Sequence, residues 1–259
     1  MPSWNSEQYL KFAGERTQPA IDLAMRIALD APARVIDLGC GPGNSTAVLK
    51  QRWVDADIFG LDSSAAMLAT ARNVFPNLKW IEGNITEWRV NESEPRFDLV
   101  FSNAALQWVP DHRREFPRLL AQVAPSGALA VQMPANLDSP AQRLIHEVAT
   151  SATWRAHFPS PPRSWHVHPP EFYYDILAPH AKRVELWTTD YHHVLANLDG
   201  IVEWYRGTGL RPWLDALPDD AARTQFLGAY RARLVAYFPE RADGRVLFPF
   251  RRLFVIAYR

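Results

Sequence analysis

Apolar and polar positions change their spacing repeatedly along the first half of the chain. Between short apolar runs lie amphipathic stretches such as 64–75, in which Met67, Leu68 and Ala71 recur at helical spacing. The short runs suit buried parallel strands, and they cover residues 34–38, 57–61, 78–81, 98–101 and 129–132. Strands that alternate with helices predict a parallel sheet with helices on both faces. We therefore expect a doubly wound, Rossmann-like α/β fold.

The second half of the chain departs from this alternation. Two further strands are expected at 183–191 and 251–258, which brings the mostly parallel sheet to seven strands. Helical patterns interrupt them, so we expect insertions at 134–182 and 192–246 within one domain that spans 1–259. In open α/β sheets ligands bind beyond the carboxyl ends of the strands, so late helical insertions are suited to form a lid there.

Signals for individual helices lie inside these insertions. Ser139-Pro140 combines a capping hydroxyl with a proline in the first turn, which predicts the start of a helix. The second insertion holds two helical patterns, 199–217 and 219–238. Without this insertion the last two strands would form a hairpin.

Composition narrows the class of protein. The 259 residues include 47% hydrophobic and 22% charged positions, as in globular proteins. Basic and acidic residues both number 28, and zero net charge argues against a nucleic-acid partner. A single cysteine, Cys40, allows no internal disulfide, and the first residues lack the pattern of a signal peptide. Since no apolar run approaches about 18 residues, we expect a cytoplasmic protein with no membrane contact.

The most informative segment joins the first predicted strand to the helix that follows it. The pattern is D-x-G-x-G-x-G, formed by Asp37, Gly39, Gly41 and Gly43. Glycines here let the backbone approach a ligand and adopt angles that side chains forbid. A nicotinamide-binding loop needs G-x-G-x-x-G, and Asn44 stands where its third glycine would be. A phosphate-binding P-loop needs a Gly-Lys-Ser/Thr that is missing here, so neither pattern fits.

This glycine segment resembles the first motif of the class I S-adenosylmethionine-dependent methyltransferases, and later landmarks extend the resemblance. Asp62 closes the second strand, where the family keeps an acid on the ribose hydroxyls. The turn at 82–85 resembles the adenine-contacting turn, with Asn84 in place of the common aspartate. The end of the fourth strand would lie near the methyl group. The resemblance implies S-adenosylmethionine as cofactor, bound by Asp37, Gly39, Gly41, Gly43, Asp62, Ser63, Met67, Asn84, Ile85, Asn103 and Ala104.

The absence of certain motifs reduces the number of acceptor classes that the sequence allows. The fourth strand leads into Asn-Ala-Ala-Leu rather than the Asn/Asp-Pro-Pro-aromatic motif of amino-methylating enzymes. A cytosine-C5 enzyme needs a Pro-Cys nucleophile, whereas Cys40 follows Gly39. The histidine pairs lack a carboxylate cluster at ligand spacing, so no metal is expected. Over nearly its full length, through segments 4–20, 103–112, 208–214 and 248–254, the chain resembles the trans-aconitate methyltransferases. That likeness implies a bacterial cytoplasmic enzyme that esterifies one carboxylate of a small polycarboxylate.

Carboxylate methylation requires little chemistry from the protein. A carboxylate with a pKa near 4 is ionised at neutral pH, so no general base and no catalytic side chain is expected. The protein then has only to orient and desolvate the acceptor, and arginines would hold its carboxylates bidentately. Candidate substrate-binding residues are Tyr9, Arg16, Trp108, Tyr205 and Arg211, with Arg206, Arg251 and Arg252 as weaker ones. Aromatic residues at helical spacing are more often ordinary core, so Trp108 and Tyr205 have that second interpretation.

Three alternatives stay open at this point. The acceptor could be another small molecule, such as a phenol or a carbon acid. The sheet could belong to a nicotinamide-dependent oxidoreductase, or the chain could bind the methyl donor without catalysis. The oligomeric state has no signature in the sequence.

Overall fold

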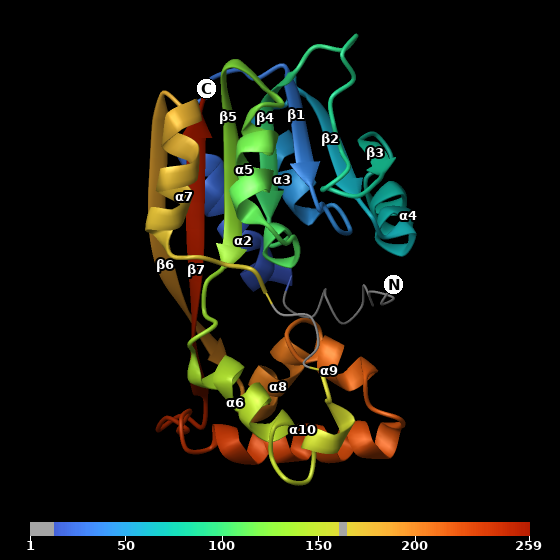
Figure 1. The fold of residues 1–259 in the computed structure, drawn as a ribbon, viewed down its shortest axis with the longest axis vertical. Coiled ribbons are helices and arrows are strands. Elements are labelled where there is room, and N and C mark those ends of the chain that lie inside the picture. Colours follow the sequence, from blue (N-terminus) through green and yellow to red (C-terminus); the bar gives the residue numbers. More distant parts are fainter. Residues whose placement is uncertain (1–12, 161–164) are drawn as a thin grey trace.

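The computed structural model describes residues 13–160 and 165–259, and its centre is a seven-stranded sheet (Figure 1). The strand order is β3-β2-β1-β4-β5-β7-β6. Only β7 runs against the others, between β5 and β6. The doubly wound, mostly parallel sheet is therefore confirmed. The strands are β1 (Arg34–Leu38), β2 (Asp57–Asp62), β3 (Lys79–Glu82), β4 (Phe97–Asn103), β5 (Val123–Pro134), β6 (Arg183–Leu195) and β7 (Val246–Tyr258).

Helices bury both faces of the sheet. On one face α2 (Ala13–Arg26) and α3 (Asn44–Arg52) cover a cluster that includes Leu23 and Phe101. On the other face lie α5 (His112–Leu120) and α7 (Pro170–Leu177). Phe116 of α5 and Tyr173 of α7 are buried there in a cluster with residues of the sheet. A further helix, α4 (Ala65–Val74), contacts β2 and β3. Since α7 packs on the sheet, only the earlier part of the predicted insertion 134–182 lies away from it.

The remaining helices form a separate layer, here called the helical unit. It consists of α6 (Pro140–Ala149), the short η2 (Arg155–His157), α8 (Leu198–Arg206), α9 (Arg211–Asp215) and α10 (Asp220–Leu234). Figure 1 shows it beyond the end toward which the arrows of β1, β2, β4 and β5 point, with β6 and β7 reaching into it. It therefore lies beyond the carboxyl ends of these strands, and its role as a lid stays a prediction.

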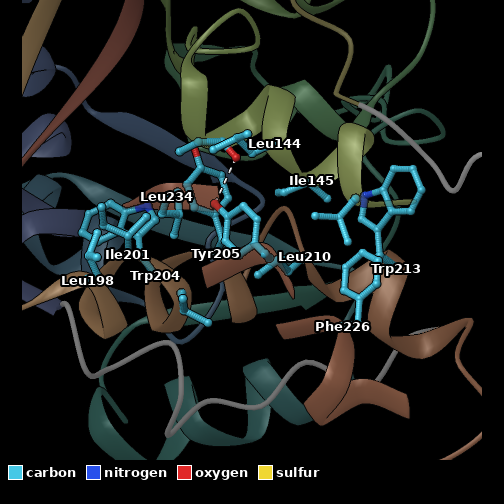
Figure 2. Close-up of a cluster of buried hydrophobic side chains, with 14 of the residues drawn as sticks. Leu144, Ile145, Leu198, Ile201, Trp204, Tyr205, Leu210, Trp213, Phe226 and Leu234 are labelled. Carbon is cyan, nitrogen blue, oxygen red and sulfur yellow. Dashed lines mark hydrogen bonds between the residues drawn. The ribbon is translucent and has the colours of Figure 1, made fainter. Parts of the chain in front are cut away.

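An aromatic core holds the helical unit together. Trp204, Tyr205, Trp213 and Phe226 lie in one buried cluster, shown in Figure 2. Ser139 caps α6 by accepting a hydrogen bond from the amide of Gln142, as its sequence predicts. The single helix expected over 199–217 is wrong, because the chain turns between α8 and α9. A β-carbon on Gly209 would lie 2.9 Å from the Tyr205 ring, so this turn packs too closely for a larger residue.

Within 13–160 and 165–259, no helix has the length and apolar character needed to span a bilayer.

Candidate functional site

The turn after β1 requires glycine for two different reasons. Gly39, Gly41 and Gly43 all have positive φ angles, of 74°, 57° and 96°. A β-carbon on Gly39 would lie 2.2 Å from that of Ala105, and one on Gly43 would lie 2.7 Å from Cη2 of Trp80. Around Gly41, by contrast, no described atom comes within 4 Å of such a carbon. The backbone at Gly41 is therefore open to close approach by a ligand.

Asp37 ties this turn to the helix behind it. Its side chain is fully buried, and Oδ2 accepts hydrogen bonds from the hydroxyls of Ser45 at 2.6 Å and Thr46 at 2.7 Å. Burial raises the pKa of the carboxyl to about 6, although the two hydroxyl bonds oppose the rise. Oδ1 has no hydrogen-bond partner in the described part of the chain. Asp37 thus braces β1 against α3 and still offers one acceptor atom.

Asp62 connects the turns that follow β1 and β2. Its Oδ2 accepts from the amide of Gly41 at 2.9 Å, and its Oδ1 accepts from the amide of Ser64 at 2.8 Å. Burial raises the pKa of this carboxyl, and the backbone bonds oppose the rise. Each oxygen retains a lone pair for a second donor. Nearby, Ser63 is exposed and Met67 is buried at the start of α4.

The turn after β3 lies against the glycine turn. Cδ1 of Ile85 is 3.4 Å from the point where a β-carbon on Gly39 would stand. The Ile85 carbonyl accepts a hydrogen bond from Nη2 of Arg118 at 2.7 Å. Asn84 is exposed, and its Oδ1 accepts from both the amide and the hydroxyl of Thr86 at 3.0 Å. The carbonyl oxygen of Asn84 therefore shapes its own turn, which leaves the amide nitrogen for a ligand.

The end of β4 holds a strained residue beside a buried amide. Ala104 has a φ of 54°, a conformation that costs an L-residue about 1–2 kcal/mol. Two hydrogen bonds fix it, from its amide to the Gln132 carbonyl at 2.9 Å and from Nε2 of Gln107 to its carbonyl at 2.7 Å. Asn103 is 8% exposed, and among the described residues its Oδ1 has no hydrogen-bond partner. Strain at a strand end that faces the helical unit is typical of a functional position.

The predicted substrate residues occupy different environments. Trp108, in η1 (Leu106–Trp108), is half-buried, and its ring lies 6.0 Å from that of Trp165. Tyr205 is fully buried, and its hydroxyl accepts a hydrogen bond from Nδ2 of Asn136 at 2.8 Å. This placement favours the core interpretation of Tyr205. Arg211 begins α9, with an 18% exposed side chain and its Nε 3.6 Å from Oδ2 of Asp215.

Two predicted residues fall outside this description. The backbone of Arg16 belongs to α2, but its side chain is outside the described part of the structure, and Tyr9 lies outside the described residues altogether.

Comparison with known proteins assigns the chain to a family. Residues 35–127 match a family model described as a methyltransferase domain. A trans-aconitate 2-methyltransferase of Azoarcus sp. strain BH72 is 49% identical over 264 residues, covering 100% of both chains. The chain belongs to the trans-aconitate 2-methyltransferase family. A second member, from Yersinia pestis strain Pestoides F, is 45% identical over 100% of this chain and 99% of its own.

Solved structures support the same fold. The YcgJ protein of Bacillus subtilis superposes with a TM-score of 0.59 at 12% identity, covering 93% of this chain and 98% of its own. A phosphoethanolamine N-methyltransferase of Haemonchus contortus, solved with S-adenosylmethionine, gives a TM-score of 0.54 at 16% identity, over 93% of this chain and 52% of its own. At these identities the likeness concerns the fold alone.

For this member of the trans-aconitate 2-methyltransferase family, the sequence analysis did not identify the buried polar residues around the end of β5 as candidate site residues. Gln132 lies beside Asn103 in the sheet register and accepts a hydrogen bond from Nη1 of Arg252 at 3.3 Å. Asn136 lies just beyond β5, where the chain enters the helical unit. A signal existed, since Gln132 interrupts the otherwise apolar run 128–134. Within the described residues, no group of three or more histidine, cysteine, aspartate or glutamate side chains could hold a metal ion.

Proposed function

We propose that this protein transfers a methyl group from S-adenosylmethionine to one carboxylate of trans-aconitate, and so forms a monomethyl ester and S-adenosylhomocysteine. The observation that carries the proposal is the 49% identity to the Azoarcus enzyme over the whole of both chains. Full coverage matters, because it includes the helical unit as well as the glycine turn. The acceptor should depend on that unit, since the glycine turn alone resembles enzymes with many acceptors.

The residues present suit the donor. Each carboxylate oxygen of Asp62 can accept a second hydrogen bond, which fits the two ribose hydroxyls. The open backbone at Gly41 allows close approach, and the amide of Asn84 can donate to the adenine edge. Asn103 and Asp37 each offer a buried acceptor oxygen that suits the ammonium group. When bound, the donor supplies the electrophilic methyl carbon.

The chain contributes orientation and exclusion of water. An ionised acceptor carboxylate attacks without loss of a proton, so no side chain has to act as a base. A group held in line with the methyl carbon and sulfur gains most of the rate enhancement available to such a reaction. Trp108, packed on Trp165, is our candidate for the side chain that excludes water at the boundary between sheet and helical unit. Arg211 is the candidate for an acceptor carboxylate within the helical unit, with Arg16 and Tyr9 as candidates from the N-terminal segment.

The primary experiment measures transfer of radiolabelled methyl from S-adenosylmethionine to trans-aconitate, with cis-aconitate, citrate and a phenol beside it. Base-labile label in trans-aconitate alone would establish donor, acceptor and ester together. Label in the phenol, with activity that rises steeply between about pH 7 and 9 because a phenol must be deprotonated first, would move the acceptor to another class. No label in any acceptor, despite binding of S-adenosylhomocysteine, would contradict the acceptor assignment alone.

The role of Arg211 is tested by Arg211→Lys. Lysine keeps the charge but loses the planar fork, so we expect the KM for trans-aconitate to rise about tenfold with donor affinity unchanged. Arg231→Lys is the matched control, because Arg231 lies on α10 of the same unit and pairs at the surface with Asp199. An unchanged KM in Arg211→Lys would place the acceptor carboxylates elsewhere.

The compartment and the partners follow from the same proposal. We expect the reaction in the cytoplasm, where the single thiol of Cys40 stays reduced, and we expect the small polycarboxylate to be the partner rather than a nucleic acid.

A further inference from the structure

His112 is a buried histidine that the proposed reaction does not use. It is the first residue of α5 and is 1% exposed. Its Nε2 lies 2.9 Å from the carbonyl oxygen of Leu106, which can only accept a hydrogen bond. Nε2 therefore carries the proton, and Nδ1 must be an acceptor. The group that faces Nδ1, at 2.8 Å, is the hydroxyl of Tyr173.

The Tyr173 hydroxyl completes a directed chain of hydrogen bonds. Its oxygen accepts from the amide of His168 at 3.1 Å, and its proton is donated to Nδ1 of His112. Tyr173 is fully buried on α7, so each polar atom in the chain has a partner from a different segment. Burial lowers the pKa of His112, which keeps the imidazole neutral and able to accept. One continuous set of hydrogen bonds thus joins Leu106, His112, Tyr173 and His168.

This chain of bonds ends on η1, which carries the residues nearest the strained end of β4. Nε2 of Gln107 donates a hydrogen bond to the Ala104 carbonyl. The backbone carbonyl of Gln107 accepts one from the amide of His166 at 2.8 Å. Trp108 packs on Trp165. Segment 165–168, which returns from the helical unit to the sheet, is therefore attached to η1 directly and through His112. The position of η1 and that of segment 165–168 therefore depend on the same set of hydrogen bonds, here called the anchor.

We propose that His112 is a positioning residue for methyl transfer, acting with Tyr173 to fix segment 103–108 against segment 165–168. The inference rests on the proposed function, because methyl transfer to trans-aconitate is the reaction for which these two segments would be held in place. A purely apolar pair could fill the same volume, but it would leave the Leu106 carbonyl and the His168 amide without these partners. The polar pair therefore selects one conformation of η1.

Tyr173→Phe is the primary test, since it removes the hydroxyl and keeps the ring. We expect kcat for trans-aconitate to fall about tenfold, because in-line placement is lost, while the affinity for S-adenosylhomocysteine stays within about twofold. The matched control is Tyr230→Phe, which removes an equally buried hydroxyl that donates to the Ala141 carbonyl at 3.0 Å, inside the helical unit. This control should lower the melting temperature similarly and leave kcat unchanged.

Rescue separates positioning from packing. His112→Leu should lose activity like Tyr173→Phe, whereas His112→Gln, whose amide can still donate to the Leu106 carbonyl, should recover part of it. Equal kcat in Tyr173→Phe and wild type, or an equal loss in Tyr230→Phe, would overturn the proposal. So would a glutamine variant no better than leucine.

An activity-independent measurement distinguishes this proposal from the proposed function. Amide hydrogen exchange of segments 103–108 and 165–168 should quicken in Tyr173→Phe and not in Tyr230→Phe. A wild type that makes no ester from trans-aconitate would defeat the proposed function, and faster exchange in Tyr173→Phe would still support the anchor. Unchanged exchange in those segments would overturn the anchor whatever the acceptor proves to be.

Discussion

The carboxyl edge of β1 and β2 and the helical unit are built on different physical principles. At the edge, backbone groups make the decisive contacts: Gly39 and Gly41 have left-handed conformations, and Asp62 accepts hydrogen bonds from two amides. These requirements act over a few residues and leave clear signals in the sequence. In the helical unit the decisive contacts are between aromatic side chains from segments far apart, such as Trp204 with Phe248 and Phe250 of β7.

This difference suggests a division of labour. The edge depends on backbone conformation and backbone hydrogen bonds, so it can hold a cofactor that many enzymes share. The helical unit is specific in shape, since its core of Tyr205, Trp213 and Phe226 determines where α9 and Arg211 stand. Truncation of a large side chain in this core should therefore lower stability and raise the KM for the acceptor, whereas damage to the edge should affect donor binding.

The largest expected effect is from Trp204→Ala. Trp204 is 2% exposed, with its ring 4.5 Å from that of His193, and truncation of a buried tryptophan costs about 3–5 kcal/mol. Urea unfolding should show this loss, while the folded variant keeps its affinity for S-adenosylhomocysteine. Tyr237→Ala is the control, since Tyr237 is 48% exposed and its removal should change little. A tenfold loss of donor affinity in Trp204→Ala would show that the two regions are not separable.

Gly39→Ala and Gly41→Ala sharpen the comparison within the edge itself. Both substitutions place a side chain at positive φ, but only the one at Gly39 collides with Ala105. We expect about 2–4 kcal/mol of destabilisation for Gly39→Ala and about 1 kcal/mol for Gly41→Ala. Gly41→Ala should instead weaken binding of S-adenosylhomocysteine in calorimetry. Full donor affinity in a stable Gly41→Ala protein would argue against close approach of the donor at that residue.

Asp62→Ala tests the ribose contact. Loss of a charged acceptor should lower the affinity for S-adenosylhomocysteine about tenfold or more, because hydrogen bonds to charged groups contribute about 1.5–3 kcal/mol. Asp57→Ala, at the exposed start of the same strand, removes only a surface ion pair with Lys79 and serves as the control. The ribose assignment fails if both variants bind the ligand equally well.

Asp37→Asn tests the raised pKa of Asp37 through the pH dependence of stability, and it should not change the contacts of the edge otherwise. The pKa of Asp37 is about 6 in the folded protein against an ordinary value of 3.8, so the folded state binds this proton more tightly than the unfolded state. Stability from this group is therefore lost as the pH rises from about 4 through 6. Asparagine does not titrate, so the stability of the wild type relative to Asp37→Asn should fall by about 1–2 kcal/mol between pH 5 and 8. Parallel pH profiles for the two proteins would mean that Asp37 does not have a raised pKa.

Prediction from sequence succeeded where one strand or one turn carries the signal. The seven strands and the capped start of α6 at Ser139 were found in this way. The family was found from a resemblance over nearly the full length of the chain. The break between α8 and α9 was missed although Gly207 and Gly209 lie in it, because the helical spacing of apolar residues appeared to continue through 199–217. The site residues stay predictions, and Tyr205 shows why: the sequence could not tell a pocket wall from a core residue.

By itself the sequence determined the sheet and the need for glycine in the turn after β1, because hydrophobic period and glycine chemistry act over short distances along the chain. The family followed from a resemblance over nearly the full length of the chain. Only the tertiary structure decided that α7 packs on the sheet, that Gln132 lies beside Asn103 and that His112 joins η1 to α7. These contacts bring together residues separated by tens of positions. Their partners are selected by burial and by satisfaction of polar groups in the folded protein, which no local pattern records.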